Sequence, residues 1–133
     1  MPPSAPILRH WCPIKILAFA AVVEIATGLV LMIDPAIVVM LLLGAEVSGA
    51  GTVLGRFFGI ALLALGLACL PARQRAERIS QAFRTMLIYN GLVALYLAHL
   101  GTIGHLKGLL LWPVAAVHAV VALLLARAWR GER

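Results

Sequence analysis

The stretch Ile14–Ile33, which reads IKILAFAAVVEIATGLVLMI, decides the fold. About 20 consecutive apolar residues form a helix long enough to cross the hydrocarbon core of a bilayer, which is about 30 Å thick. Lys15 stands at the start of the stretch, and Glu24, near its middle, is its only acidic residue. A carboxylate at that depth costs about 3 kcal/mol unless it is paired, protonated or in contact with water. We therefore expect a membrane-spanning helix in which Glu24 needs a partner on another helix.

The composition of the whole chain is that of a membrane protein. Of its 133 residues, 63% are hydrophobic and only 12% are charged, whereas a soluble domain carries about 25% charged residues. The net charge of +6 does not indicate nucleic-acid binding, because the basic residues form no stripe interleaved with aromatic residues. Cys12 and Cys69 lie far apart, so neither a thiol redox centre nor a zinc or other metal site is expected.

Three more apolar segments follow the first one, and each is separated from the next by charged residues, glycine or proline. We expect an all-α integral membrane four-helix bundle that forms a single transmembrane domain over residues 1–133. The first segment is longer than the hydrophobic region of a signal peptide, so we expect it to be retained. The predicted spans are about residues 14–33, 53–70, 83–100 and 109–126.

The basic residues predict the orientation of these spans. Positive charge is kept in the cytoplasm, and only Arg56 and Lys107 fall on the opposite side from the other nine basic residues. We therefore expect a multi-pass protein of a bacterial-type inner membrane with both termini in the cytoplasm. Trp11 and Trp129 suit the inner interface, and Trp112 suits the outer one. The nine residues on the predicted cytoplasmic side are Arg9, Lys15, Arg73, Arg75, Arg78, Arg84, Arg127, Arg130 and Arg133.

A short apolar segment over residues 35–43 lies between the first two spans. Asp34 followed by Pro35 is typical of a helix start, and Gly44 is typical of a helix end. The segment is too short to cross a bilayer, so it is expected to lie at the outer interface or to dip partway into the membrane. It would serve as a lid on the bundle or, alternatively, as a gate for a ligand.

Three polar residues from three spans fall at matching depth. At a rise of 1.5 Å per residue, Glu24, His118 and Asn90 lie about 14, 13 and 15 Å below the outer ends of their spans. Lipid offers no hydrogen bonds, so such groups should face the bundle interior and find one another. Glu24 and His118 would share a proton, and Asn90 can donate to the carboxylate and accept from the imidazole.

Other polar residues of the spans give alternative partners. Arg56 lies near the outer end of its span, from which its side chain would snorkel outward or turn down to form an ion pair with Glu24. Tyr96 and His99 lie above Asn90 and complete the candidate binding or proton-site residues, whereas Tyr89 is expected to point to another face. The difference in depth between His99 and His118, about 10 Å, disfavours a bis-histidine haem. No haem, quinone or other cofactor is predicted.

Small residues predict where helices approach closely. Gly55 and Gly59 form a GxxxG pattern, and Ala115, Ala119 and Ala122 recur at helical spacing on the last span. Such faces bring helix backbones together. They would pack within the bundle or, alternatively, form a homodimer face.

Several of these features resemble the DoxX-like group of small bacterial four-helix membrane proteins. The matching parts are Gly28, Asp34-Pro35, Leu42-Leu43-Gly44 and the run Arg56-Phe57-Phe58-Gly59-Ile60-Ala61-Leu62-Leu63. DoxX is associated with a terminal quinol oxidase, and many relatives have no assigned role. The resemblance implies the fold and an accessory or small-molecule role, and it implies no catalytic residue.

A second resemblance is to the small multidrug-resistance exporters, which also have four helices and a glutamate in the first. It rests on Glu24-Ile-Ala-Thr-Gly28-Leu-Val-Leu-Met32. The connection after the first span is longer than in that family, and the charge bias argues against dual insertion. Arg56 and His118 have no clear counterpart there.

Three functions follow from these observations. In the first, the chain is a non-enzymatic accessory or assembly subunit of a membrane complex, and its buried polar residues hold helices together. In the second, Glu24 exchanges a proton for a small lipophilic or cationic molecule that is bound or transported. The third, an enzyme acting on a membrane substrate such as a quinone, would require a redox cofactor that nothing in the sequence indicates. The expected surroundings are the lipid bilayer, and the expected partner is a second copy or a larger membrane complex.

Overall fold

Five helices make up nearly all of the part of the chain that the computed structural model describes, residues 7–71 and 76–131. In chain order they are α1 (Ile7–Ile33), α2 (Pro35–Leu43), α3 (Ala50–Cys69), α4 (Ala76–Ile103) and α5 (Leu111–Gly131). All except α2 are long and apolar enough to cross a membrane. The predicted all-α four-helix bundle with one short extra helix is therefore confirmed.

Some residues used in the charge and aromatic arguments fall outside this description. Arg73, Arg75 and Arg133 are not among the described residues, and for Arg9 and Trp11 the description does not extend to the side chain. The same holds for the side chain of Cys12, whereas Cys69 is a buried free thiol.

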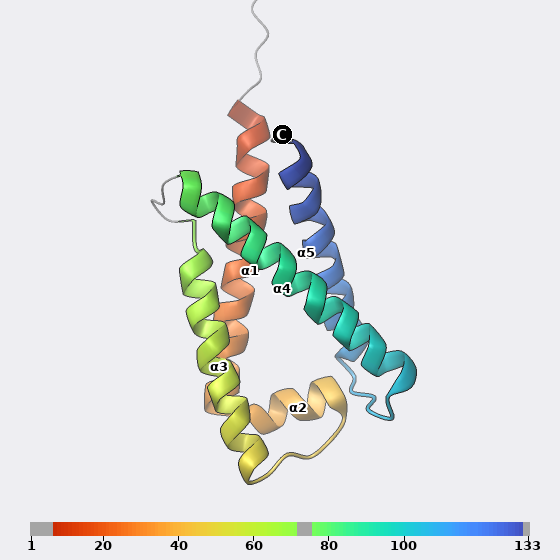
Figure 1. Cartoon of the computed structure of the whole chain (residues 1–133). Helices are drawn as coiled ribbons and strands as arrows, with labels where there is room; N and C mark the ends of the chain where they lie inside the picture. The colour runs from red at the N-terminus through yellow and green to blue at the C-terminus, as the bar shows by residue number, and fades with distance from the viewer. Residues whose placement is uncertain (1–6, 72–75, 132–133) are drawn as a thin grey trace, which may run out of the picture.

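The short helix α2 begins and ends where local chemistry predicts. The Asp34 carboxylate accepts hydrogen bonds from the backbone N–H groups of Ala36 at 3.0 Å and Ile37 at 3.3 Å, so it caps the helix. Gly44 ends the helix with φ of 67°, a left-handed conformation that glycine adopts without strain. Figure 1 shows α2 lying crosswise to α1 at the end of the molecule far from the described chain ends.

The four long helices form two pairs. α1 packs chiefly along α3, and α4 packs chiefly along α5, while contacts between the two pairs are fewer. Glycines make the first pair tight, because a Cβ atom built on Gly59 would lie 2.7 Å from the Gly28 carbonyl oxygen. The predicted GxxxG pattern thus packs inside the bundle: Gly59 faces Gly28, and Gly55 faces Pro35.

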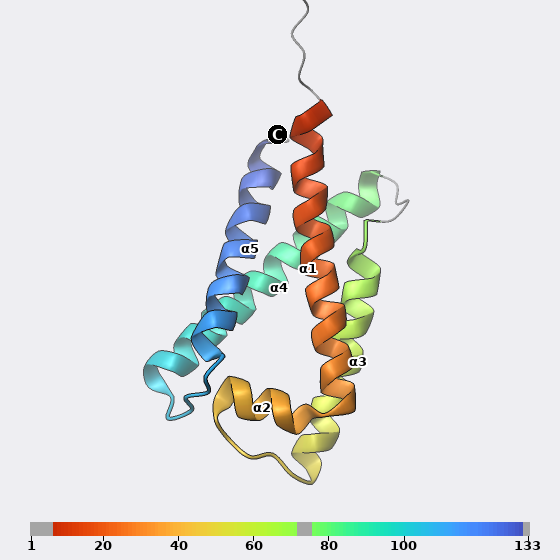
Figure 2. The ribbon, with the colours of Figure 1, turned by 180° about the vertical axis from the view of Figure 1, so that it is seen from behind.

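All four long helices contribute to one apolar core near the end of the bundle where α1 begins and α5 ends (Figure 1). Figure 2 shows from behind that α4 crosses α1 and α5 obliquely. This crossing brings the middle of α4 against both neighbours, so residues from three helices can meet there. The buried core residues are Leu17, Ala20, Ala21, Cys69, Ala82, Phe83, Met86, Val121 and Leu125.

Candidate functional site

Glu24 is buried within the bundle. It lies in the middle of α1, and only 2% of its surface is exposed. Its two carboxylate oxygens face different helices: Oε2 faces Tyr89 of α4, and Oε1 faces His118 of α5. We call Glu24, Tyr89 and His118 the polar centre. The carboxylate therefore points away from the acyl chains, as a charge-bearing group in a membrane span must.

Tyr89 is a hydrogen-bond partner of Glu24 that the sequence did not predict. Its hydroxyl donates a hydrogen bond to Glu24 Oε2 at 3.0 Å, although the sequence predicted that Tyr89 points to another face. Depth alone already placed this hydroxyl beside Asn90, in the same layer as Glu24. The error concerned the rotation of α4 about its own axis, which depth does not report: the Tyr89 side of that helix faces α1.

His118 is held by contacts on both ring nitrogens. Nδ1 lies 2.9 Å from the backbone carbonyl oxygen of Val114, one turn earlier on α5. A carbonyl oxygen only accepts, so Nδ1 must carry the proton. Nε2 lies 3.6 Å from Glu24 Oε1, which is within ion-pair range and longer than a hydrogen bond. The predicted meeting of Glu24 and His118 is therefore present in the fold.

This geometry restricts the protons that Glu24 and His118 can hold. Because Nδ1 is already protonated, a neutral His118 presents a bare lone pair on Nε2 to Glu24. A carboxylate opposite that lone pair would give two acceptors and no proton between them. One proton at this contact, either on Nε2 beside a carboxylate or on Oε1 beside a neutral imidazole, would relieve this opposition of two acceptors. In both arrangements the pair has no net charge, which suits a site inside hydrocarbon.

Asn90 is buried but does not join the polar centre through a hydrogen bond. Its side-chain amide donates to the Met86 carbonyl oxygen at 2.8 Å, one turn earlier on α4. Of the pairings that the sequence left open, the one in which this amide donates to the Glu24 carboxylate is therefore not the one found; the amide donates to Met86 instead. The physical reason is that its own helix offers an acceptor within reach, so the amide needs no partner from another helix.

The remaining candidates lie on the outside of the bundle. Arg56 is exposed on α3, and among the described residues it forms no ion pair with Glu24. Tyr96 is 63% exposed, and His99 is exposed as well. The fold therefore brings two of the six predicted residues together, Glu24 and His118, and leaves Arg56, Tyr96 and His99 apart from them.

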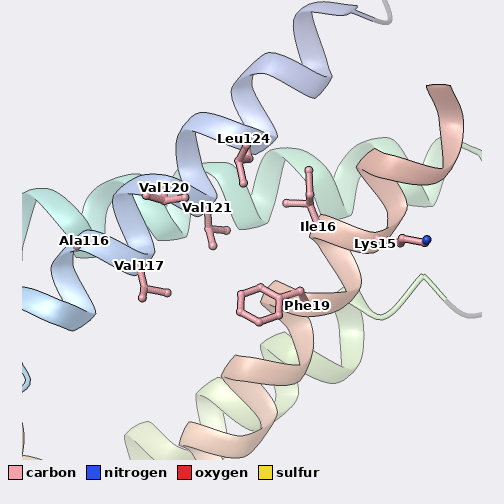
Figure 3. A pocket seen from close by; sticks show the side chains of 8 residues that line it. All are labelled: Lys15, Ile16, Phe19, Ala116, Val117, Val120, Val121 and Leu124. Atoms are coloured by element: carbon pink, nitrogen blue, oxygen red, sulfur yellow. The ribbon is translucent and has the colours of Figure 1, made fainter. Parts of the chain in front are cut away.

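An apolar groove runs between α1 and α5 on one side of the bundle (Figure 3). Its volume is about 500 Å³, within the range of ligand-binding pockets. No residue of the polar centre lines it. Among the described residues, no cluster of three or more side chains has the composition of a metal site. The groove is lined by Lys15, Ile16, Phe19, Ala116, Val117, Val120, Val121 and Leu124.

Comparison of the chain with protein-family models found no match. Comparisons with curated proteins and with solved structures found no significant match either.

Proposed function

We propose that the protein is a non-enzymatic inner-membrane bundle that serves as an accessory or assembly subunit of a membrane complex. In this proposal the polar centre holds the two helix pairs together. The observation that supports it best is the environment of Glu24: the side chain is buried, and both carboxylate oxygens face side chains of the same bundle. Buried polar contacts of this kind commonly join helices in membranes.

The outer face of α3 supports a role in assembly. Phe57 and Phe58 are 64% and 53% exposed, and Leu54 is 67% exposed. Arg56 stands among them, exposed within a helix that is apolar enough to cross a membrane. A neighbouring helix with an acidic residue would cover the aromatic side chains and pair with the guanidinium. That neighbour would be another subunit or a second copy of the chain.

The resemblance to DoxX-like proteins fits this proposal at the level of the fold. Gly28 permits the close approach of α1 to α3, and Asp34 caps α2. Gly28 and Asp34 thus have structural roles here, and no residue that carries the resemblance belongs to the polar centre.

Purification in a mild detergent, followed by measurement of the particle mass, tests the proposal. We expect a particle heavier than one chain, and the Phe57→Ala/Phe58→Ala variant should release the partner. Leu123→Ala on α5, which is 66% exposed in the wild type, is the control and should leave the particle unchanged. A lone monomer with no co-purifying protein would contradict the proposal.

The contact of 3.6 Å between Glu24 Oε1 and His118 Nε2 favours a second candidate, proton-coupled binding or transport, because one proton there would leave the pair without net charge. A small lipophilic cation that entered between the helix pairs could replace this proton opposite the carboxylate. Glu24→Gln should then abolish pH-dependent binding of lipophilic cations by protein in proteoliposomes between pH 5 and 9, whereas Tyr96→Phe should not. Equal binding by wild type and Glu24→Gln across this range would exclude this function.

A further inference from the structure

The groove between α1 and α5 has walls suited to hydrocarbon. Phe19 from α1 and Val117, Val120 and Leu124 from α5 line it, and these side chains are between 40% and 56% exposed. Figure 3 shows Phe19 and Val117 on opposite sides of the opening. The walls lie within helices that are apolar enough to span a membrane. A lipid acyl chain would cover these side chains, whereas a polar solute would find almost no partner along the walls.

One end of the groove is basic. Arg127 follows Val120 by seven residues and Leu124 by three, so it lies on the same face of α5, one turn beyond the groove. Its side chain is exposed. Lys15 contributes its stem to the wall, and Figure 3 shows its amine turned away from α5. Arg127 is therefore better placed than Lys15 to bind a ligand head group at this end of the groove.

The position of this basic end indicates the class of lipid. Since α5 ends at Gly131, Arg127 lies near the end of that helix. This is the end of the bundle where α1 begins (Figure 1), and the positive-inside rule places it at the cytoplasmic leaflet. That leaflet carries the anionic lipids, and basic pockets between membrane helices bind their head groups. A guanidinium also matches the geometry of a phosphate through paired hydrogen bonds.

We propose that this groove binds one acyl chain of an anionic phospholipid, with the lipid phosphate held by Arg127. The site combines an apolar channel with a cation at its end, which is the complement of a phospholipid that carries negative charge. It is separate from the polar centre, and its occupancy does not depend on the function proposed above.

Native mass spectrometry of the full chain in a mild detergent tests the charge requirement. The probes are phosphatidylglycerol and phosphatidylcholine with identical acyl chains. We expect the wild type to retain phosphatidylglycerol preferentially and Arg127→Gln to retain about fivefold less of it. Retention of phosphatidylcholine should not change. Arg78→Gln is the matched control, because it removes the same charge from the start of α4, away from the groove, and it should behave as wild type.

A second pair of variants tests the groove itself. Ala116→Phe places a ring in the groove and should reduce retention of both lipids at least about threefold, since the acyl chain loses its site. Ala64→Phe adds the same ring to an exposed position of α3 and should have no effect. Circular dichroism and gel filtration of each variant establish that the fold is intact.

Four outcomes would overturn the proposal. The wild type could retain the two lipids equally, or Arg78→Gln could lose as much phosphatidylglycerol as Arg127→Gln. If a folded Ala116→Phe variant retained lipid at the wild-type level, the groove would not be the site of the acyl chain. A co-purifying polypeptide that Ala116→Phe releases and added lipid does not displace would assign the groove to a partner helix instead.

Discussion

The hydrogen bond from Tyr89 to Glu24 joins α4 to α1 in the middle of the bundle. Tyr89→Phe removes the hydroxyl and keeps the ring, so it isolates this bond. We expect the free energy of unfolding to fall by about 1 kcal/mol, the usual size of a polar contact between membrane helices. Thermal unfolding in detergent measures the change. Tyr96→Phe is the control, since Tyr96 is 63% exposed on the same helix, and an equal loss there would contradict the assignment.

Glu24 can be replaced in two ways that distinguish shape from hydrogen bonding. Glu24→Ala leaves the Tyr89 hydroxyl and His118 Nε2 without their partner, which should cost about 2–3 kcal/mol of folding free energy. Glu24→Gln keeps an oxygen that accepts from Tyr89 and adds an N–H group that can donate to Nε2. The Glu24→Gln variant should therefore lose less than half as much folding free energy as the Glu24→Ala variant. Unfolding of both variants under the same conditions compares their stabilities. A greater loss of folding free energy for Glu24→Gln than for Glu24→Ala would disprove an arrangement with one proton between Glu24 and His118.

At the scale of single residues, sequence depth located part of the polar centre. The 1.5 Å rise per residue correctly placed Glu24 and His118 in one layer, and they meet in the fold. Depth does not report which way a side chain points around its helix. For that reason Tyr89 was assigned to the wrong face, and Asn90 was given a partner on another helix although its own helix supplies one.

The packing of α1 on α3 depends on glycine. A Cβ atom on Gly59 would lie 2.7 Å from the Gly28 carbonyl oxygen and 2.9 Å from the Met32 backbone nitrogen, so the two helices would have to separate. We expect Gly59→Ala to lower the free energy of unfolding by about 1–3 kcal/mol.

Gly91→Ala provides the control for this prediction. A Cβ atom on Gly91 meets nothing within 4 Å, so the variant should be unchanged or up to about 1 kcal/mol more stable, as alanine favours helix. Thermal unfolding of both variants in one detergent compares them. Equal effects at the two positions would mean that close backbone contact does not hold α1 to α3.

Element boundaries were predicted well where local chemistry sets them and less well elsewhere. The short helix covers the predicted residues, Pro35–Leu43, because Asp34 and Gly44 cap it. The spans predicted at residues 14–33 and 83–100 lie within longer helices, Ile7–Ile33 and Ala76–Ile103. Hydropathy marks the part of a helix that lipid surrounds, whereas backbone hydrogen bonding continues into the charged flanks.

At the scale of the whole molecule, the polar centre connects two helix pairs that also share the apolar core but contact each other less than the helices within each pair do. Glu24 belongs to the pair α1 and α3, whereas Tyr89 and His118 belong to the pair α4 and α5. The oblique crossing of α4, which no local pattern in the sequence reveals, makes this connection possible. A change at the polar centre is therefore expected to affect the docking of the pairs more than the helices themselves.

The arrangement of the helices also predicts the sidedness of the whole protein. The start of α1, the end of α3, the start of α4 and the end of α5 lie toward one end of the bundle, and α2 lies at the other (Figure 1). The described basic residues at the first end include Lys15, Arg78, Arg84, Arg127 and Arg130. From the positive-inside rule we therefore expect the first end to lie in the cytoplasm.

Two serines test this orientation, because both are exposed and neither carries charge: Ser48 precedes α3, and Ser80 lies in the first turns of α4. In a chain with Cys12→Ser and Cys69→Ala, a membrane-impermeant thiol reagent should label Ser48→Cys in cells whose inner membrane is intact. It should label Ser80→Cys only after that membrane is permeabilised, since α3 crosses the bilayer between the two positions. The reverse pattern would show that the protein has the opposite orientation. Labelling of both positions in intact cells would show that α3 does not span the membrane.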